Sequence, residues 1–170
     1  MLQLMAVIQR TNYLADSKCD ALVAALPTMR FAHGRGLRKS IEGGNKVSVY
    51  QHTRWQWYPE SLKTAWKTNM PSDVVSSFLV SSFMKIPKDT GILYPTQIGL
   101  PEQKAIGCFL SVALTDGQHL IINGTKYDVN KGDALLFDGS DTYETEISSS
   151  DAFWCINMVP SWKKATYGAS

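Results

Sequence analysis

The chain has 170 residues, a formal net charge of +2 and a hydrophobic fraction of 44%. A chain of this size is expected to form one domain, whose core buries roughly 70% of the surface that the unfolded chain exposes. No apolar run reaches the roughly 20 residues that a membrane helix needs, and residues 1–8 have neither a basic leader nor a small-residue cleavage site. We therefore expect neither a membrane span nor secretion.

The three cysteines, at positions 19, 108 and 155, are widely spaced and form no Cys-x-x-Cys pair. An odd number of isolated cysteines indicates neither a disulfide framework nor a zinc site. The sequence therefore predicts buried free thiols in a protein of the reducing cytoplasm.

Charge is distributed unevenly along the chain. Residues 30–67 contain eight Lys or Arg and two acidic residues, a net charge of +6, whereas residues 100–170 contain five basic and nine acidic residues, a net charge of −4. We expect an electrically polarised molecule.

The N-terminal part predicts one strand and two helices. Residues 2–9 can form a strand, and residues 16–26 have the leucine spacing of a short helix that Pro27 ends. Residues 59–69 predict a second helix, because a proline is well suited to a first helical turn, and Pro71 closes it.

Glycines scattered among basic residues favour a surface loop over residues 30–45, and residues 46–53 alternate as a strand would. Beyond residue 76 the sequence predicts short strands separated by turns. The clearest turn is Asn123-Gly124, which suits a type I′ hairpin, and the serine run 148–150 is typical of a flexible tip. The predicted strands are residues 78–86, 92–98, 105–114, 119–122, 125–129, 134–137, 143–147 and 153–159.

Many short strands after two helices predict an α+β chain that is mostly β. The expected architecture is an antiparallel jelly roll with the two N-terminal helices packed on one sheet. Residues 1–170 form a single domain in this interpretation. Residues 1–75 supply the N-terminal strand and helix support, residues 76–160 form the jelly-roll core, and residues 161–170 are a tail.

Three segments carry a resemblance to a known family: LADSKCDALVAAL, SSFMKIPKDTGILYPTQIG and ALTDGQHLIINGTKYDVNKGDALLFDGSDTYET. They resemble the opening helix, the strand before the first metal motif and the approach to the last histidine of the prolyl-hydroxylase-like oxygenases. The aspartyl/asparaginyl hydroxylases have a similar ending. The resemblance implies a double-stranded β-helix, which is a cupin-like jelly roll, and in active members Fe(II) and 2-oxoglutarate as cofactors.

The family's functional residues are missing from the matching positions. Iron in these enzymes is held by two histidines and one carboxylate. The resemblance puts the first histidine and the carboxylate at Thr96 and Ile98, and the second histidine at Tyr143. The basic residue that grips 2-oxoglutarate would fall near Phe153. Since all four roles are vacant, the resemblance implies a degenerate oxygenase without a catalytic site and without a cofactor.

A different metal site is an alternative. The histidines at positions 33, 52 and 119 show no spacing that puts two ligands on one face. An oxygenase with atypical ligands would have to use a set such as His52, His119 and Glu144. The acidic residues between positions 138 and 146 favour a solvated hairpin end over a cation site.

The segments RFAHGRGLRKS and HTRWQWYPE combine basic and aromatic residues. Guanidinium groups can pair with phosphates, and indoles can stack on bases. Two tryptophans at alternate strand positions would also share one face, which favours a core role for them. The candidate residues for an anionic partner are Arg35, Arg38, Lys39, Arg54, Trp55 and Trp57.

These patterns favour a non-catalytic binding or assembly module on a degenerate oxygenase-like jelly roll. Its basic face would meet an anionic or protein partner, through nucleic-acid binding by residues 30–67 or through self-assembly. The alternatives are an Fe(II)/2-oxoglutarate-dependent hydroxylase with atypical ligands, and a structural subunit of a viral or other symmetric particle.

Overall fold

In the computed structural model of the whole chain, we describe residues 7–27, 41–43, 48–50, 56, 58–92 and 107–160. The helices in these residues are α1 (Asp16–Ala25), α2 (Glu60–Asn69) and α3 (Ser72–Ser77). None of them is long and apolar enough to cross a membrane. The strands are β1 (Ile8–Arg10), β2 (Ile41–Gly43), β3 (Ser48–Tyr50), β4 (Val80–Ile86), β5 (Thr90–Ile92), β6 (Gly107–Ala113), β7 (Gln118–Ile122), β8 (Thr125–Val129), β9 (Ala134–Asp138), β10 (Tyr143–Glu144) and β11 (Ala152–Pro160).

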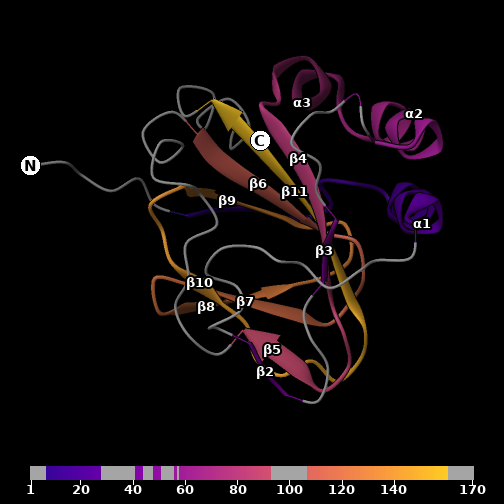
Figure 1. Cartoon of the computed structure of the whole chain (residues 1–170). Helices are drawn as coiled ribbons and strands as arrows, with labels where there is room; N and C mark the ends of the chain where they lie inside the picture. Colours follow the sequence, from indigo (N-terminus) through magenta and orange to yellow (C-terminus); the bar gives the residue numbers. More distant parts are fainter. Residues whose placement is uncertain are drawn as a thin grey trace, which may run out of the picture.

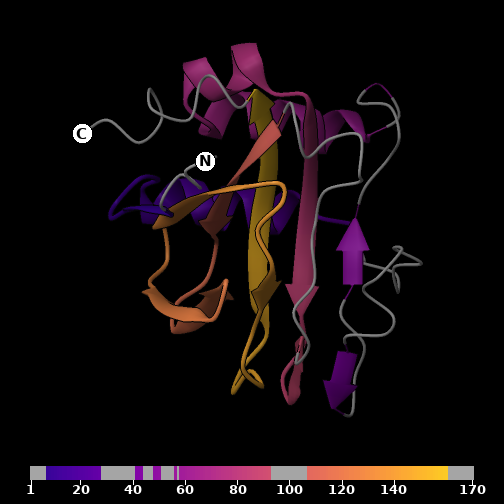
Figure 2. The same ribbon diagram turned by 90° about the vertical axis from the view of Figure 1, so that its left-hand side faces the viewer.

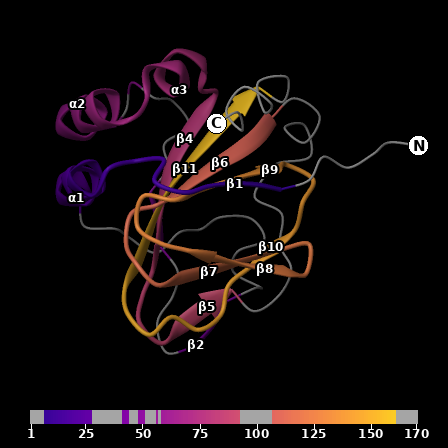
Figure 3. The same cartoon turned by 180° about the vertical axis from the view of Figure 1, so that it is seen from behind.

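A large antiparallel sheet forms the centre of the molecule, with the strand order β1-β9-β6-β11-β4-β3. A three-stranded sheet, β10-β7-β8, and the pair β2-β5 lie across one of its faces (Figure 1). The three helices lie on the opposite side, as the view from behind also shows (Figure 3). Figure 2 shows β11 and β4 running side by side along the molecule, in the register that pairs Trp154 with Met84. The predicted antiparallel architecture, mostly β with helices packed on one sheet, is confirmed.

The large sheet is buried on both faces, so its central strands contain few polar residues. Every residue of β6 is buried, and β11 is buried at eight of its nine positions. Strands covered on both faces are expected to have continuous apolar runs instead of alternation. Successive residues of β6 and β11 therefore contribute in turn to two separate cores.

We call the core between the helices and the large sheet the outer core. Apolar side chains from α1, α2 and α3 pack there against one face of β4, β6, β9 and β11. Its buried residues are Leu14, Cys19, Leu22, Tyr58, Leu62, Trp66, Met70, Val74, Phe83, Cys108, Leu110, Val112, Leu114, Ala134, Leu136, Cys155 and Val159. The three cysteines are free and buried, as predicted.

We call the core between the large sheet and the smaller sheets the inner core. Its buried residues are Met84, Ile86, Ile92, Phe109, Ala113, Leu120, Ile122, Val129, Leu135, Phe137, Tyr143, Ala152, Trp154, Ile156 and Met158. It occupies the space between the two layers in Figure 1.

One buried amide connects helix α2 to the middle of the large sheet. Asn157 on β11 is fully buried, and its Oδ1 accepts hydrogen bonds from Trp66 Nε1 (3.0 Å) and Ser81 Oγ (2.9 Å). Its Nδ2 donates to the carbonyl of Leu110 (3.4 Å). A buried polar group is tolerated when its donors and acceptors are satisfied, so this amide fixes where α2 sits on the sheet.

The Gly132-Asp133 turn joins three parts of the chain. Gly132 has a φ of +86° and donates its N–H to Ala113 O on β6 (2.8 Å). Its carbonyl accepts from Leu14 N (2.9 Å), in the loop that leads into α1. The Asp133 carboxylate accepts from the backbone N–H of Asn12 (2.9 Å) and Asn130 (3.0 Å). This turn thus also positions the first helix.

Most predicted elements are confirmed, including both helices and the Asn123-Gly124 hairpin, whose two residues have positive φ (49° and 82°). The structure has a third helix, α3, that the sequence pattern did not predict. α3 begins at Ser72 because Pro71 stands just before the first turn of this helix, where a missing N–H costs nothing. The Pro71 carbonyl also accepts a hydrogen bond from Val75 N (3.0 Å).

Two boundary predictions also need correction. Part of the predicted loop at residues 30–45 is strand β2, which pairs with β5. Strand β10 is shorter than the predicted 143–147 and ends at Glu144. Strands β1 and β3, from the predicted support region 1–75, extend the large sheet at its two edges.

We predict that Gly132→Ala destabilises the fold much more than Gly124→Ala. Both glycines have positive φ, for which an L-residue costs roughly 1–2 kcal/mol. A Cβ at position 124 meets no atom within 4 Å, whereas at position 132 it would lie 2.1 Å from Leu14 O. Such overlap typically adds about 1–3 kcal/mol. Urea unfolding of the two variants measures the difference, and equal losses would contradict this account of the turn.

Candidate functional site

Tyr143 is the predicted site residue that the structure places most clearly. It lies on β10 opposite Ile122 of β7, is 2% exposed and belongs to the inner core. Burial raises the pKa of Tyr143 well above its ordinary value of 10.0. The side chain is therefore a neutral phenol that fills space between the two sheets.

The surroundings of Tyr143 are apolar. The large-sheet residues that share the inner core with it include Trp154, Ile156 and Met84. Ser111 and Ser82 pair with Ile156 from the neighbouring strands and share its face of the sheet. These hydroxyl groups supply none of the imidazole or carboxylate ligands that ferrous iron prefers.

The other positions that the resemblance assigned to the metal, Thr96 and Ile98, lie outside the described residues. The fallback ligand His52 also lies outside the described residues. So do the predicted anion-binding residues, which are Arg35, Arg38, Lys39, Arg54, Trp55 and Trp57. Their roles stay predictions.

His119 and Glu144, the two fallback ligands that the structure describes, lie on the face of the three-stranded sheet that points away from the inner core. The inward positions of β7 are 118, 120 and 122, and Glu144 is paired with Ile121. His119 Nδ1 contacts Asp128 Oδ1 on β8 (2.6 Å). Within the described ranges, no three His, Cys, Asp or Glu residues gather as metal ligands would.

The acidic residues near the hairpin have structural roles. Asp141 is 3% exposed, and its carboxylate accepts from Asn123 Nδ2 (2.8 Å) and from the backbone N–H of Asp138 (2.9 Å). The predicted solvated hairpin end is therefore wrong for Asp141, which joins two turns through satisfied hydrogen bonds. Glu146 forms an ion pair with Lys126 (3.0 Å).

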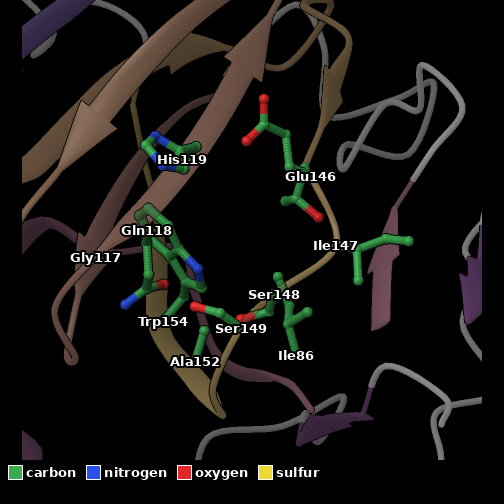
Figure 4. Close-up of a pocket in the computed structure, with 11 residues that line it drawn as sticks. Ile86, Gly117, Gln118, His119, Glu146, Ile147, Ser148, Ser149, Ala152 and Trp154 are labelled. Carbon is green, nitrogen blue, oxygen red and sulfur yellow. The ribbon is translucent and has the colours of Figure 1, made fainter. Parts of the chain in front are cut away.

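A pocket of about 200 Å³ opens beside the inner core (Figure 4). One wall is the start of β7, with Gly117, Gln118 and His119, and the opposite wall is the segment 145–149. Ile86, Ala152 and Trp154 close it from the large sheet. The pocket thus lies where β4 ends and β11 begins.

Gln118 brings a buried, unsatisfied acceptor to this pocket. The residue is 6% exposed, and its Nε2 donates to the carbonyl and hydroxyl oxygens of Thr115 (both 2.5 Å). Its Oε1 is buried and has no hydrogen-bond partner among the described residues. Figure 4 shows this oxygen on the pocket side of the amide and the nitrogen on the far side. An unpaired buried acceptor costs about 1–3 kcal/mol.

Hydrogen bonds to β5 hold the opposite wall in place. The N–H of Thr145 donates to Ile92 O (2.8 Å), and the N–H of Ser148 donates to Thr90 O (2.9 Å). The backbone of Glu146 passes so close to Gly91 that a Cβ there would lie 2.8 Å from Glu146 O. Ser148, predicted as part of a flexible tip, is therefore tied to β5.

No sequence pattern indicated this pocket. Gln118 stands at a strand start, where a polar residue is ordinary, and Ser148 and Ser149 belong to a run that is typical of a surface turn. Only the pairing of the segment 145–148 with β5, a contact across more than 50 positions of sequence, brings these side chains together.

Comparisons with known proteins identify the fold through solved structures but find no match in sequence. No family model and no curated protein matches the sequence. Among solved structures, a non-heme α-ketoglutarate-dependent carbocyclase, SnoK from nogalamycin biosynthesis, matches with a TM-score of 0.62 and 11% identity over 91% of this chain and 79% of its own. A prolyl-4-hydroxylase from Pseudomonas putida matches with a TM-score of 0.59 and 13% identity over 91% of both chains. The fold is the double-stranded β-helix.

A prolyl hydroxylase from Trichoplax adhaerens, in complex with a peptide of the hypoxia-inducible factor, has the same fold. It matches with a TM-score of 0.58 and 9% identity over 94% of this chain and 86% of its own. Identities this low show the fold alone. The predicted resemblance of this jelly roll to 2-oxoglutarate oxygenases is confirmed at the level of structure.

We predict that Tyr143 makes the fold sensitive to high pH. Because its pKa is raised in the folded state, the unfolded chain loses the phenol proton first, and stability falls as the pH passes 10.0. Burial likewise raises the pKa of Cys19 to about 11 and that of Cys155 to about 12. Urea unfolding at neutral and alkaline pH should therefore show that Tyr143→Phe loses less stability at alkaline pH than the wild type does. Part of the alkaline loss should remain in the variant, because both cysteines are still present.

Tyr127→Phe is the matched control, because this tyrosine is only partly buried on β8. An equal alkaline loss in Tyr143→Phe and in the wild type would show that Tyr143 is not buried as described.

Proposed function

We propose that this chain is a non-catalytic binding or assembly module on an oxygenase-type jelly roll, with a basic face for an anionic partner. The observation that carries the proposal is the burial of Tyr143 in the apolar inner core. The family resemblance gives this position to the second metal histidine. A fold often keeps its architecture while its function changes with the site residues.

The residues at the family's metal positions do not fit ferrous iron. Two histidines and a carboxylate would be needed, and Thr96, Ile98 and Tyr143 supply an alcohol, an alkyl chain and a phenol. Ala152 and Trp154 stand beside the position expected for the basic residue that grips 2-oxoglutarate, and both are buried in the inner core. We therefore derive no oxygen chemistry for this chain.

Charge supports an anionic partner. Residues 30–67 carry a net charge of +6, which includes Arg35 between Gly34 and Gly36 and Arg38 two positions further on. Exposed acidic residues of the C-terminal half, such as Asp116 and Asp128, give the opposite sign. A separation of charge of this kind steers an anion toward one part of the surface.

We predict that the protein does not hold stoichiometric iron. Full-length protein would be loaded anaerobically with ferrous iron and 2-oxoglutarate, freed of excess metal by gel filtration and measured by elemental analysis. The expected result is far less than one iron per chain and no consumption of 2-oxoglutarate, because the ligand set is missing. One tightly held iron per chain, lost in both His52→Ala and His119→Ala, would instead establish an oxygenase with atypical ligands.

We also predict that the protein binds single-stranded nucleic acid with strong salt dependence. Each phosphate contact adds about 0.7 to the slope of log affinity against log salt. Arg35→Ala/Arg38→Ala should therefore lower both the affinity and this slope. The matched control, Lys18→Ala/Lys88→Ala, removes two exposed lysines from α1 and the β4–β5 turn. Equal effects of both variants would contradict a specific basic face, and a stable oligomer without nucleic-acid binding would favour the assembly role.

A further inference from the structure

The turn between β7 and β8 contains the only Asn-Gly pair in the sequence. Asn123 and Gly124 are both exposed, and both have positive φ (49° and 82°). Asparagine followed by glycine is the dipeptide most prone to deamidation, because a glycine has no side chain to shield its backbone nitrogen from the neighbouring amide carbon. A reactive pair therefore stands at a position that water reaches.

Deamidation of this pair needs only the chain itself and water. Gly124 N attacks Asn123 Cγ and forms a C–N bond, while Nδ2 leaves as ammonia with the proton that Gly124 N gives up. Water then opens the resulting succinimide ring at either carbonyl carbon and gives aspartate or isoaspartate. The net change exchanges an amide for a carboxylate, and nothing is oxidised or reduced.

Hydrogen bonds to the neighbouring turn hold the Asn123 side chain in place. Its Nδ2 donates to Asp141 Oδ1 (2.8 Å), and its Oδ1 accepts from Thr142 N (2.9 Å) and Thr142 Oγ1 (3.3 Å). The bond to Asp141 is charge-assisted, which makes it the strongest of the three. Rotation of the amide toward Gly124 N would break these contacts, so the closed turn opposes the attack.

The carboxylate that holds this amide is itself fixed. Asp141 is 3% exposed, and its Oδ2 accepts from the backbone N–H of Asp138 (2.9 Å). The Asn123 N–H also donates to the carbonyl of Thr142 (2.9 Å). The side chain and the backbone of Asn123 are thus both joined to the segment that leads into β10.

We infer that the Asn123–Gly124 turn is a deamidation site of this chain, and that Asp141 slows the reaction while the turn is closed. Asp141 acts here as a positioning residue, since it holds the amide away from the attacking nitrogen and takes no part in the bond changes. The inference does not depend on the proposed binding role.

Conversion changes what faces Asp141. In the aspartate form a carboxylate oxygen replaces Nδ2, which lies 2.8 Å from Asp141 Oδ1, so two like charges meet where a donor met an acceptor. In the isoaspartate form an extra methylene enters the backbone of a two-residue hairpin loop, whose geometry the flanking strands require. Both products weaken the link between this turn and Thr142, which precedes Tyr143 on β10.

The test follows conversion of full-length protein over time by mass spectrometry of the peptide that contains residues 123 and 124. The wild type should convert more slowly when folded than in urea. Asp141→Ala should accelerate conversion of the folded chain by roughly tenfold or more, because losing a hydrogen bond to a charged group raises the population of the open turn by about that factor. Equal rates for the folded and the unfolded wild type would overturn the inference.

Two further variants separate local opening from general loss of stability. Gly132→Ala destabilises the fold at a different turn, where its Cβ would meet Leu14 O. Equal acceleration by Gly132→Ala and Asp141→Ala would show that global unfolding sets the rate, and the role of Asp141 would be lost. Thr142→Val removes only the 3.3 Å contact and should accelerate conversion by about twofold. No acceleration in either Asp141→Ala or Thr142→Val would contradict the restraint as well.

The product is tested directly with Asn123→Asp. This variant should unfold at a lower urea concentration than Asn123→Gly, which removes the same side-chain hydrogen bonds without adding a charge and suits the positive φ of this position. An Asn123→Asp protein as stable as the wild type would show that no donor at position 123 faces Asp141, and would overturn the inference.

Discussion

Burial of the large sheet on both faces is the constraint on which the rest of the structure depends. Strands β6 and β11 must supply an apolar side chain to the outer core and to the inner core in turn, and this leaves few positions for polar chemistry. Asn157 is one of the few polar groups in the middle of the sheet, and it is used to seat helix α2 through Trp66. The hydrophobic stabilisation of both layers therefore comes from the same strands.

Burial of the large sheet on both faces also limits the chemistry that side chains between the sheets can perform. A catalytic centre between the sheets needs polar ligands and space for substrate, whereas the described inner core is filled by residues such as Trp154, Phe137 and Tyr143. At the rim, the segment 145–149 and the start of β7 leave a pocket with polar walls. The fold is thus that of the oxygenase jelly rolls, with its inner core filled in the described residues.

Local patterns made much of the fold predictable. The Asn123-Gly124 hairpin follows from backbone preferences of two residues, and α2 follows from the proline at its start. Strand β2 could not be predicted, because it exists through pairing with β5, which lies almost 50 residues further along the chain. Helix α3 was missed because Pro71 can end one helix or precede another, and the sequence alone does not distinguish the two.

For the candidate site, the sequence identified Tyr143 as a substituted position but contained no sign of the pocket. A missing ligand can be recognised from one residue type in a motif, whereas a pocket depends on contacts between distant segments. Gln118 and the segment 145–149 line one pocket only because Thr145 and Ser148 pair with β5.

We propose that no metal ion binds between the sheets, and methyl NMR with a paramagnetic ion tests this by position. Mn²⁺ would be titrated into full-length protein with ¹³C-labelled Ile and Leu methyl groups. We expect the signals of Leu120, Ile122 and Ile156, which belong to the inner core with Tyr143, to keep their line widths. Saturable broadening strongest at these three residues would place an ion inside the jelly roll and contradict the account.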